Sequence, residues 1–564
     1  MHRLFETHRT RRHFYLDGKW QFITDPHDVG KKEEWFKDFP AAARSCFVPS
    51  CWNNELGLYH YEGAAWYGTV FCTESRNLRL VCHAVNTEAD VYLDGRHLGY
   101  HYGGFVPFGF TVTGLEPGEH AVTIRVDNTH NNTDTIPLAR VDWFHYGGII
   151  RSVEVMELGD LWLSECRLDY AFTGEDRVKL TVRTAVANLT DQPRNAVCAV
   201  YLDGCEAACL PILCAPGENA LETEPIVLEN VMRWSPENPR LYAVRLAIDG
   251  DDIIDRIGFR EIGTEKGKIL LNGRPLFLKG INRHEDHPDW GFAFPAKLMQ
   301  KDIEIIRQMG CNTIRCSHYP NSELFLDLCD EYGMLLWEEI PMWGFPEDVL
   351  QNPLVLERGL AFHRAMVARD RHHPSIIFWG LHNEIDTACE AGYRVTEAFA
   401  KAVRALDGSR LITYASDHDL EDRCYALADV VCINRYFGWY QETYLHWPTH
   451  LEMIKEKLSR EGLADHPLLV SEFGAAGIKG DTGFESRKWS EQYQLELLEY
   501  VIDLFTRDTD VAGFYIWQYC DVRSAKEHDY NRARSFNNKG LVDEYRRPKL
   551  AYWAMERMLN GINR

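Results

Sequence analysis

Two glutamates that each follow an apolar run are the residues with the clearest chemical potential in this sequence. Glu384 ends the run SIIFWGLHNE (375–384), and Glu472 lies in PLLVSEFG (467–474). Two carboxyl groups that face each other can cleave a glycosidic bond, because one protonates the leaving oxygen while the other attacks the anomeric carbon. A separation of ~5–5.5 Å between them predicts retention of configuration through a covalent glycosyl-enzyme intermediate. We therefore interpret the pair as the catalytic carboxyl groups of a retaining glycosidase.

Polar and aromatic side chains at the ends of the other apolar runs fit the same chemistry. Asn383 directly precedes the first glutamate and can bond a sugar 2-hydroxyl, a contact that strengthens in the transition state. Arg315 and Tyr436 can hold the second glutamate ionised, with Asn434 as a further supporting residue, and Trp517 offers an apolar face to a sugar ring. Each residue alone is more often a surface ion pair or a core side chain, so the prediction rests on the joint pattern.

These residues can meet only if parallel strands bring them to one edge of a sheet. The second half of the chain has the alternation of strand-like and helical segments that produces parallel strands. Eight short β-rich runs alternate with helical stretches, which is typical of a (β/α)₈ TIM barrel over 263–564. The strands are expected at 277–285, 312–320, 334–341, 375–384, 411–416, 430–437, 467–474 and 511–519. Barrel enzymes carry their sites at the C-terminal ends of the strands, where the polar residues gather here.

The first half of the chain reads as two all-β domains. Residues 1–160 contain alternating runs such as EADVYLDGRHLG (88–99), separated by Gly, Pro, Asn and Asp turns. Residues 161–262 continue with runs such as RVKLTVRTAVANLT (177–190), which suit a small β-sandwich. We therefore expect a multidomain protein with two sandwiches before the barrel.

Composition excludes several classes of function. The net charge of −23 opposes nucleic-acid binding, and no stretch approaches the ~18 apolar residues of a membrane span. The basic start lacks an apolar signal region, so we expect a cytoplasmic protein with its 16 cysteines reduced. The cluster at 284–287 fits no standard zinc spacing, so we expect neither a metal nor another cofactor.

Three motifs make the chain recognisable at these residues. They are GINRHEDHPDWG (280–291), IRCSHYPNSELFLDLCDEYGMLLWEE (314–339) and WGLHNE (379–384). The sequence resembles glycoside hydrolase family 2, and within it the β-glucuronidases. That resemblance implies a jelly-roll domain, an immunoglobulin-like sandwich and a barrel, with Glu384 as acid/base and Glu472 as nucleophile. It also implies a homo-oligomer, by analogy with other large enzymes of the family.

Two further segments point to a uronic acid as the sugar. NRYFGWY (434–440) resembles the tyrosine-bearing loop of the β-glucuronidases, which makes Tyr436 and Tyr440 substrate-binding residues. FNNKGLVDEYRRPK (536–549) resembles their uronate-recognition segment, in which Asn537 and Lys539 grip the sugar carboxylate. A carboxylate calls for a cation and a neutral donor, which lysine and asparagine supply. On residues alone, Asn-Asn-Lys-Gly would be read as a tight turn.

The same resemblance assigns the remaining candidates. Asp142, in DWFHYGGIIR (142–151), would reach from the first domain to the sugar hydroxyls, as His318 would from the second barrel strand. The arginine that precedes the uronate segment is not cleanly placed. We take Arg534 as a supporting residue, with Arg532 as the alternative.

The expected activity is exo-hydrolysis of small-molecule or oligosaccharide β-D-glucuronides. A short segment after the third strand (341–359) suggests an open mouth suited to larger substrates. The alternatives are a β-galacturonidase or a β-galactosidase of the same family and, more remotely, an inactive carbohydrate-binding protein. Insensitivity of turnover to Lys539→Ala would favour the galactosidase, since carboxylate binding is expressed in the transition state.

Overall fold

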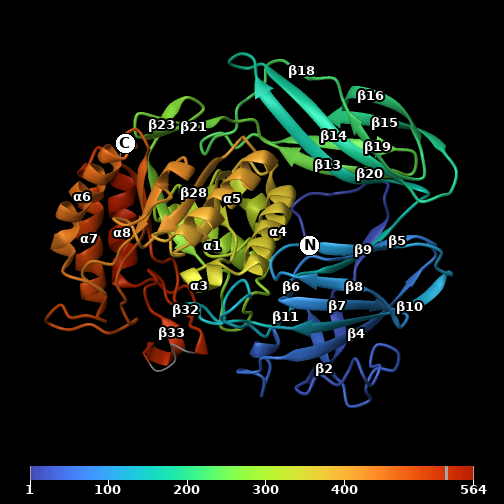
Figure 1. The fold of residues 1–564 in the computed structure, drawn as a ribbon, viewed down its shortest axis with the longest axis horizontal. Coiled ribbons are helices and arrows are strands. Elements are labelled where there is room, and N and C mark those ends of the chain that lie inside the picture. The colour runs from blue at the N-terminus through green and yellow to red at the C-terminus, as the bar shows by residue number, and fades with distance from the viewer. Residues whose placement is uncertain (1, 527–530, 563–564) are drawn as a thin grey trace.

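The computed structural model describes residues 2–526 and 531–562, which form two β-sandwiches and a closed barrel (Figure 1). The first sandwich pairs a six-stranded with a four-stranded antiparallel sheet, and both contribute to one core that includes Trp20, Leu80 and Ile124. The larger sheet has the order β3 (Arg44–Val48), β2 (Gly18–Asp25), β4 (Ala64–Thr73), β10 (Gly118–Asp127), β7 (Glu88–Leu93), β8 (Arg96–Tyr102). The smaller has β1 (His13–Tyr15), β12 (Val153–Glu157), β5 (Leu78–Cys82), β9 (Phe108–Val112). A short pair, β6 (Val85–Asn86) and β11 (Gly148–Ile149), completes this jelly-roll.

The second sandwich is immunoglobulin-like, with an apolar core between two antiparallel sheets. One sheet contains β13 (Leu161–Phe172), β14 (Val178–Asn188), β17 (Gly217–Glu222) and β18 (Ile226–Leu228). The other has the order β16 (Cys205–Cys214), β15 (Arg194–Leu202), β19 (Tyr242–Ile248), β20 (Asp251–Ile257). A three-stranded sheet, β21 (Ile262–Glu265), β22 (Lys268–Leu271) and β23 (Arg274–Leu276), leads into the barrel.

The closed parallel barrel confirms the eight strands expected from the sequence. They are β24 (Leu278–Arg283), β25 (Thr313–Cys316), β26 (Leu335–Glu339), β27 (Ile376–Asn383), β28 (Leu411–Ser416), β29 (Val431–Asn434), β30 (Leu468–Phe473) and β31 (Val511–Ile516). Each strand is buried along its whole length or nearly so, because neighbouring strands and surrounding helices cover both faces.

Helices surround the barrel, and their buried faces follow the expected 3.6-residue spacing. They are α1 (Ala296–Gln308), α2 (Glu323–Tyr332), α3 (Glu347–Leu350), α4 (Pro353–Asp370), α5 (Glu390–Leu406), α6 (Trp447–Arg460), α7 (Glu491–Arg507) and α8 (Leu550–Gly561). One expectation was wrong: between β28 and β29 the chain has only a 3₁₀ turn, Tyr425–Leu427, in place of an α-helix. Within the described residues, no helix is both long and apolar enough to cross a membrane.

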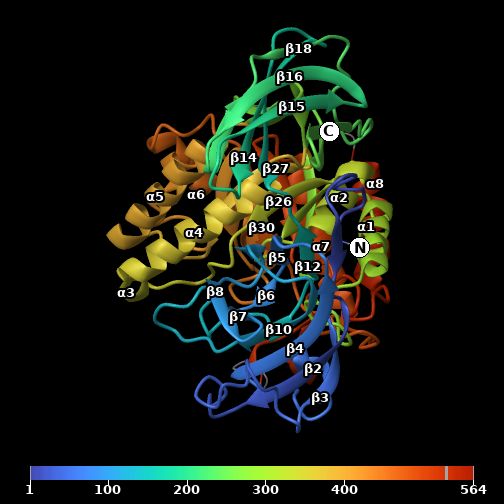
Figure 2. The same ribbon diagram turned by 90° about the vertical axis from the view of Figure 1, so that its right-hand side faces the viewer.

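Both sandwiches lie beside the barrel, and Figure 2 shows the immunoglobulin-like sandwich at one end of the molecule and the jelly-roll at the other. The loop between β10 and β11 lies against the segment after β31, where the Phe144 amide donates to the Arg523 carbonyl at 3.1 Å. The Arg523 guanidinium also stacks on the Phe144 ring at 3.3 Å. This contact places a loop of the first domain at the mouth of the barrel.

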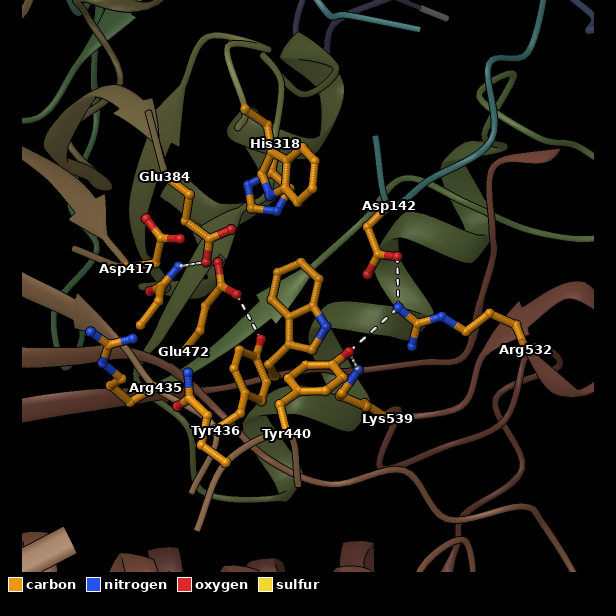
Figure 3. Close-up of a pocket in the computed structure, with 14 residues that line it drawn as sticks. Asp142, His318, Glu384, Asp417, Arg435, Tyr436, Tyr440, Glu472, Arg532 and Lys539 are labelled. Carbon is orange, nitrogen blue, oxygen red and sulfur yellow. Dashed lines mark hydrogen bonds and ion pairs between the residues drawn. The ribbon is translucent and has the colours of Figure 1, made fainter. Parts of the chain in front are cut away.

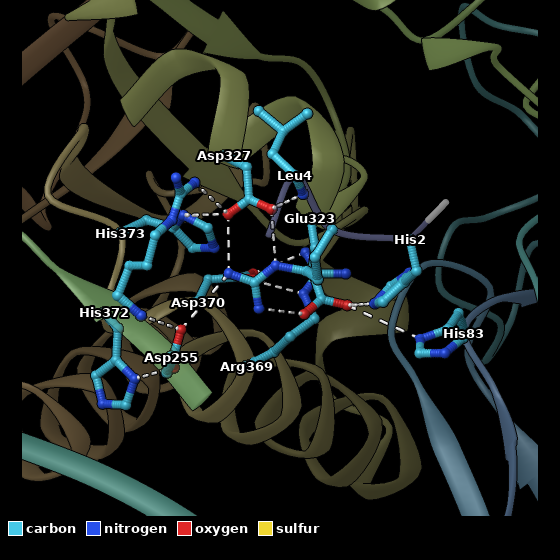
Figure 4. A network of polar contacts seen from close by, with 12 residues as sticks. His2, Leu4, His83, Asp255, Glu323, Asp327, Arg369, Asp370, His372 and His373 are labelled. Atoms are coloured by element: carbon cyan, nitrogen blue, oxygen red, sulfur yellow. Dashed lines mark hydrogen bonds and ion pairs between the residues drawn. The ribbon is translucent and has the colours of Figure 1, made fainter. Parts of the chain in front are cut away.

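A buried polar network fastens the N-terminal segment to the other domains (Figure 4). The Arg3 guanidinium donates twice to Asp327 of α2 at 2.8 Å and lies 3.6 Å from Asp255 of β20. Glu323 of α2 accepts from Arg3 and contacts His83 of the jelly-roll at 3.9 Å. The network therefore joins residues of all three domains.

We expect Arg3→Ala to destabilise the protein by about 3 kcal/mol, because it leaves the buried Asp327 carboxylate without its main partner. Burial alone would raise the pKa of the Asp327 carboxyl, but Arg3 holds that pKa below its ordinary value. The stabilisation is thus present above a pH of ~4 and is lost as the pH falls through the folded-state pKa. Urea unfolding at neutral and acidic pH measures this.

The control for that experiment is Arg9→Ala, which removes an arginine from an ion pair with Glu6 whose side chains are 64% and 62% exposed. Exposed pairs contribute little to stability, so this variant should unfold like the wild type. Equal unfolding free energies for Arg3→Ala and the control would contradict the anchoring role of the network.

Candidate active site

The C-terminal ends of the barrel strands surround a cavity of about 290 Å³ (Figure 3). Its wall contains both glutamates and most of the residues expected beside them: Asp142, His318, Glu384, Asn434, Tyr436, Tyr440, Glu472, Trp517 and Lys539. Arg315, Asn383 and Asn537 contact these residues from behind the wall. Residues that are distant in sequence thus converge at one site, which is the geometry that a barrel imposes.

Glu472, on β30, is held by two donors. Arg315 Nη1 donates to its Oε1 at 2.7 Å, and the Tyr436 hydroxyl donates to its Oε2 at 2.7 Å. Both donors stabilise the charged carboxylate and fix its orientation toward the cavity. The Tyr436 hydroxyl in turn keeps its proton, because burial and the nearby Glu472 charge raise the pKa of Tyr436 well above its ordinary value.

Arg315 is the centre of a fully buried network below the cavity. Its guanidinium donates to both oxygens of Glu339, at 2.9 and 3.0 Å, and to the side-chain oxygens of Asn282 and Asn383, at 3.1 and 2.5 Å. Burial alone would lower the pKa of Arg315, but Glu339 and Glu472 raise it, so the guanidinium remains charged. Arg315 therefore keeps its positive charge against the Glu472 carboxylate.

Glu384 stands at the end of β27 in a different environment. Its backbone φ of 50° lies in the left-handed region, which is uncommon for glutamate, and its amide donates to Ala415 at 2.9 Å. Asn434 Nδ2 donates to Glu384 Oε1 at 2.8 Å, while Ser471 Oγ donates to the Asn434 oxygen and so fixes the orientation of that amide. Burial, and then the charge of Glu472, raise the pKa of Glu384 well above its ordinary value. Glu384 is thus suited to hold a proton at neutral pH while Glu472 is ionised.

Asn383 offers a donor next to the two glutamates. Its side-chain oxygen accepts from Arg315, which turns the amide nitrogen away from the arginine. That nitrogen is buried and has no hydrogen-bond partner within the described chain. A buried donor without a partner is costly, so a ligand hydroxyl that reaches it gains a strong contact.

Aromatic rings form one face of the cavity. The rings of His318 and Trp517 stack with centroids 5.1 Å apart. The Trp143 ring also contacts His318, with centroids 5.4 Å apart. His318 Nδ1 lies 2.7 Å from a Glu339 oxygen. Burial, and then Arg315, lower the pKa of His318 to about 3, so the ring is neutral and its other nitrogen can exchange hydrogen bonds with a sugar.

The opposite end of the cavity holds a buried ammonium group. Lys539 is 1% exposed, and its Nζ donates to the Tyr440 hydroxyl at 2.7 Å. Over residues 2–526 and 531–562, no carboxylate forms an ion pair with this lysine. Burial lowers the pKa of Lys539. Burial alone would raise the pKa of Tyr440, but the positive charges of Lys539 and Arg532 lower it below its ordinary value. The site is therefore short of negative charge, which an anionic ligand would supply.

Asp142 links the jelly-roll to this end of the cavity. Its carboxylate accepts from Arg532 Nη2 and from Asn537 Nδ2, each at 2.8 Å. Arg532 lines the cavity, whereas Arg534 pairs with Glu544 at 2.8 Å and lies outside the wall. The expectation that Arg534 is the supporting residue is therefore corrected: Arg532 takes that position, because Arg534 is paired with Glu544 outside the wall.

Among the described residues, three groups of ligand-type side chains lie close enough together to hold an ion, and none of the three includes a residue of the cavity wall. They are His2–His83–Glu323, Asp327–Asp330–His373 and Glu347–Asp386–Cys389. The second is already engaged, since Arg3 occupies Asp327 and His373 lies 2.6 Å from Asp330.

Comparison with known proteins decides the family. The model for glycosyl hydrolases family 2, TIM barrel domain, matches residues 262–563. The chain belongs to glycoside hydrolase family 2. A family 2 β-galacturonidase from Eisenbergiella tayi bound to galacturonate is 35% identical, with a TM-score of 0.93 and 100% of both chains covered. A β-glucuronidase from Ruminococcus gnavus in complex with D-glucuronic acid is 27% identical, with a TM-score of 0.85 and 99% of both chains covered.

Curated relatives agree with this family. The β-glucuronidase of Paenibacillus borealis is 28% identical over 95% of each chain, and human β-glucuronidase is 27% identical over 95% of this chain and 89% of its own. The protein is therefore a glycoside hydrolase, as the sequence predicted.

Sequence reasoning missed several residues of this family 2 hydrolase. Trp343, Asp417 and Gln441 line the cavity, and Glu339 holds both Arg315 and His318. Glu339 ends a barrel strand with its carboxylate next to the motif arginine, which was a usable signal. Asp417 follows β28 in a loop without a motif, so only the fold brings it to the site.

Proposed function

We propose that this family 2 hydrolase removes terminal β-D-glucuronic acid from β-D-glucuronides, with retention of configuration. The buried Lys539 ammonium, which has no carboxylate partner in the described chain, is the observation that carries the proposal. A C6 carboxylate of the sugar supplies that partner, with Tyr440 and Arg532 beside it. The Paenibacillus and human β-glucuronidases support the same sugar.

In the proposed mechanism, Glu472 attacks the anomeric carbon while Glu384 donates its proton to the leaving oxygen. Arg315 and Tyr436 keep the Glu472 carboxylate charged and aimed at the sugar until the bond to carbon forms. Glu384, now ionised, then takes a proton from water, which hydrolyses the covalent glycosyl-enzyme and releases Glu472. The free amide nitrogen of Asn383 bonds the 2-hydroxyl, where contacts strengthen as charge develops on the ring.

A second candidate is hydrolysis of β-D-galacturonides, which the higher identity to the Eisenbergiella enzyme favours. The two sugars carry the same carboxylate and differ in the direction of the 4-hydroxyl. Asp142 accepts from both Arg532 and Asn537 at the carboxylate end of the cavity, so it is placed to contact that edge of the ring. Both candidates use the same pair of glutamates and the same lysine.

The test is a comparison of p-nitrophenyl β-D-glucuronide, β-D-galacturonide and β-D-galactoside by their kcat/KM values. The proposal predicts that the glucuronide exceeds the galactoside by at least about 10²-fold, because the buried lysine selects the anion. A higher kcat/KM for the galacturonide than for the glucuronide would show that the substrate is a galacturonide, and it would leave the proposed carboxylate-binding site unchanged. A galactoside that equals or exceeds both uronides would reject a uronidase.

The pH profile follows from the raised pKa of Glu384. The acid must be protonated to assist departure of a poor leaving group, so kcat/KM for methyl β-D-glucuronide is expected to fall as the pH rises through that pKa. Asn434 donates to the carboxylate and so opposes the rise, which means that Asn434→Ala should move the alkaline limb to higher pH. Profiles of both enzymes measure the shift, and an alkaline limb at the same pH in both would contradict the assignment of Glu384.

A further inference from the structure

On the side of the two glutamates away from Lys539 and Arg532, the cavity carries a second polar pair that the mechanism leaves unused (Figure 3). Asp417 follows β28 and lies close enough to Glu384 for its charge to act on that carboxyl. Arg435 follows β29 and reaches the same part of the wall. The uronate is expected to occupy the Lys539 side, so this side is left for the leaving group.

Asp417 has an acceptor that nothing in the described chain uses. Its Oδ1 atom is buried and has no hydrogen-bond partner, since His418 Nε2 lies 3.7 Å away. The side chain as a whole is 43% exposed, so the remaining part of the carboxylate faces the cavity. The exposed oxygen of this carboxylate is the one that a ligand in the cavity can reach, and it can accept a hydrogen bond from a ligand hydroxyl.

Arg435 is held from behind and presents a free donor group. Its Nε and Nη2 donate to Asp419, which also lies 2.6 Å from His450 Nε2, so the plane of the guanidinium is fixed. Its Nη1 has no hydrogen-bond partner among residues 2–526 and 531–562, and the side chain is 20% exposed. Arg435 and Asp417 influence each other electrostatically but do not form an ion pair in the described chain. A fixed donor and a fixed acceptor therefore flank the same space.

Trp343 also lines the cavity, with its ring centroid 6.4 Å from that of Trp143. It pairs with Asn383 through a β-bridge, directly before Glu384. A cavity wall that contains an indole, a donor and an acceptor suits a sugar ring, which has apolar faces and a hydroxylated edge.

We propose that Asp417 and Arg435 form a leaving-group subsite that binds a hydroxylated sugar, so that the preferred substrate is a uronosyl oligosaccharide rather than a simple phenyl or alkyl uronide. The inference rests on the proposed function, because it places the uronate on the Lys539 side. A hydroxyl of the second sugar donates to the exposed oxygen of the Asp417 carboxylate, and another accepts from Arg435 Nη1. A methyl or phenyl leaving group satisfies neither atom.

The experiment compares kcat/KM for β-D-glucuronosyl-glucose and for methyl β-D-glucuronide. Both leaving groups are alcohols that need the acid, so their ratio isolates contacts in the subsite from proton transfer by Glu384. In the wild type the disaccharide should be the better substrate. Asp417→Ala should lower the ratio by roughly tenfold to a hundredfold, the effect of losing a hydrogen bond to a charged group, and Asp417→Asn, which keeps an acceptor oxygen, should lower it less.

The matched control is Glu421→Gln, an exposed carboxylate in the same loop that does not line the cavity, and it should leave the ratio unchanged. An unchanged ratio in Asp417→Ala, with both substrates slowed equally, would overturn the subsite and assign Asp417 to the environment of Glu384. An error in the proposed function would give a different result, because the wild-type enzyme would then hydrolyse neither glucuronide. The same ratio can then be measured on the galacturonides.

Discussion

Glu472→Gln is expected to lower kcat for every β-D-glucuronide by roughly 10⁴-fold or more, the range seen when a catalytic nucleophile is removed. The amide has the same shape as the carboxylate, but it carries no charge for Arg315 to orient and it cannot form the glycosyl-enzyme. Because the variant cannot form the bond between residue 472 and the anomeric carbon, phenyl and alkyl glucuronides should be affected alike. Steady-state rates with p-nitrophenyl and methyl β-D-glucuronide measure the effect.

Glu384→Ala is the matched comparison, because the acid matters most for a poor leaving group. General acid catalysis contributes ~10²–10⁴-fold, so this variant should lose far more activity on the methyl than on the p-nitrophenyl glucuronide. Thermal unfolding of both variants shows whether each remains folded. A uniform loss in Glu384→Ala together with a leaving-group-dependent loss in Glu472→Gln would reverse the two assignments.

Lys539→Ala is expected to lower kcat/KM for β-D-glucuronides by about 10²–10³-fold. The variant leaves the sugar carboxylate in a buried position without its cation, and removing one partner of a buried charge pair costs about 2–5 kcal/mol. Hydrolysis of the neutral p-nitrophenyl β-D-galactoside should be unchanged or slightly faster, since that sugar never uses the ammonium group. The quantity to measure is the ratio of the two kcat/KM values.

Lys488→Ala provides the control for this prediction. Lys488 is exposed and its Nζ donates to the Trp439 carbonyl at 2.6 Å, outside the cavity, so its removal should leave the ratio unchanged. A ratio that survives in Lys539→Ala would show that this lysine only supports Tyr440 and that the sugar carboxylate is bound elsewhere.

The barrel could be predicted because its strands are buried, and a buried strand appears in the sequence as a short, continuous apolar run. Runs such as SIIFWGLHNE are continuously apolar and end in polar residues, which marks both the strand and its functional end. No comparable pattern in the sequence showed that the helix between β28 and β29 is missing. Its short loop is instead tied down by side chains, among them Asp422, which accepts from the Tyr414 and Ser416 hydroxyls.

The site was predictable where chemistry fixes the residue type and unpredictable where only packing fixes the position. Glu384 and Glu472 follow from the reaction, and Lys539 follows from the charge of the sugar. Nothing local distinguishes Arg532 from Arg534, because one turn of backbone decides which side chain reaches Asp142 and which reaches Glu544. For such residues the folded chain is needed.

The most direct measurement is mass spectrometry after incubation with 2-deoxy-2-fluoro-β-D-glucuronosyl fluoride, whose ring fluorine slows hydrolysis of the glycosyl-enzyme. A retaining uronidase with these roles should accumulate one covalent adduct, and digestion should locate it on the peptide that contains Glu472. The neutral 2-deoxy-2-fluoro-β-D-galactosyl fluoride should label the enzyme far more slowly, because it lacks the carboxylate that Lys539 binds. An adduct on a residue other than Glu472, or faster labelling by the neutral reagent, would contradict the central claim.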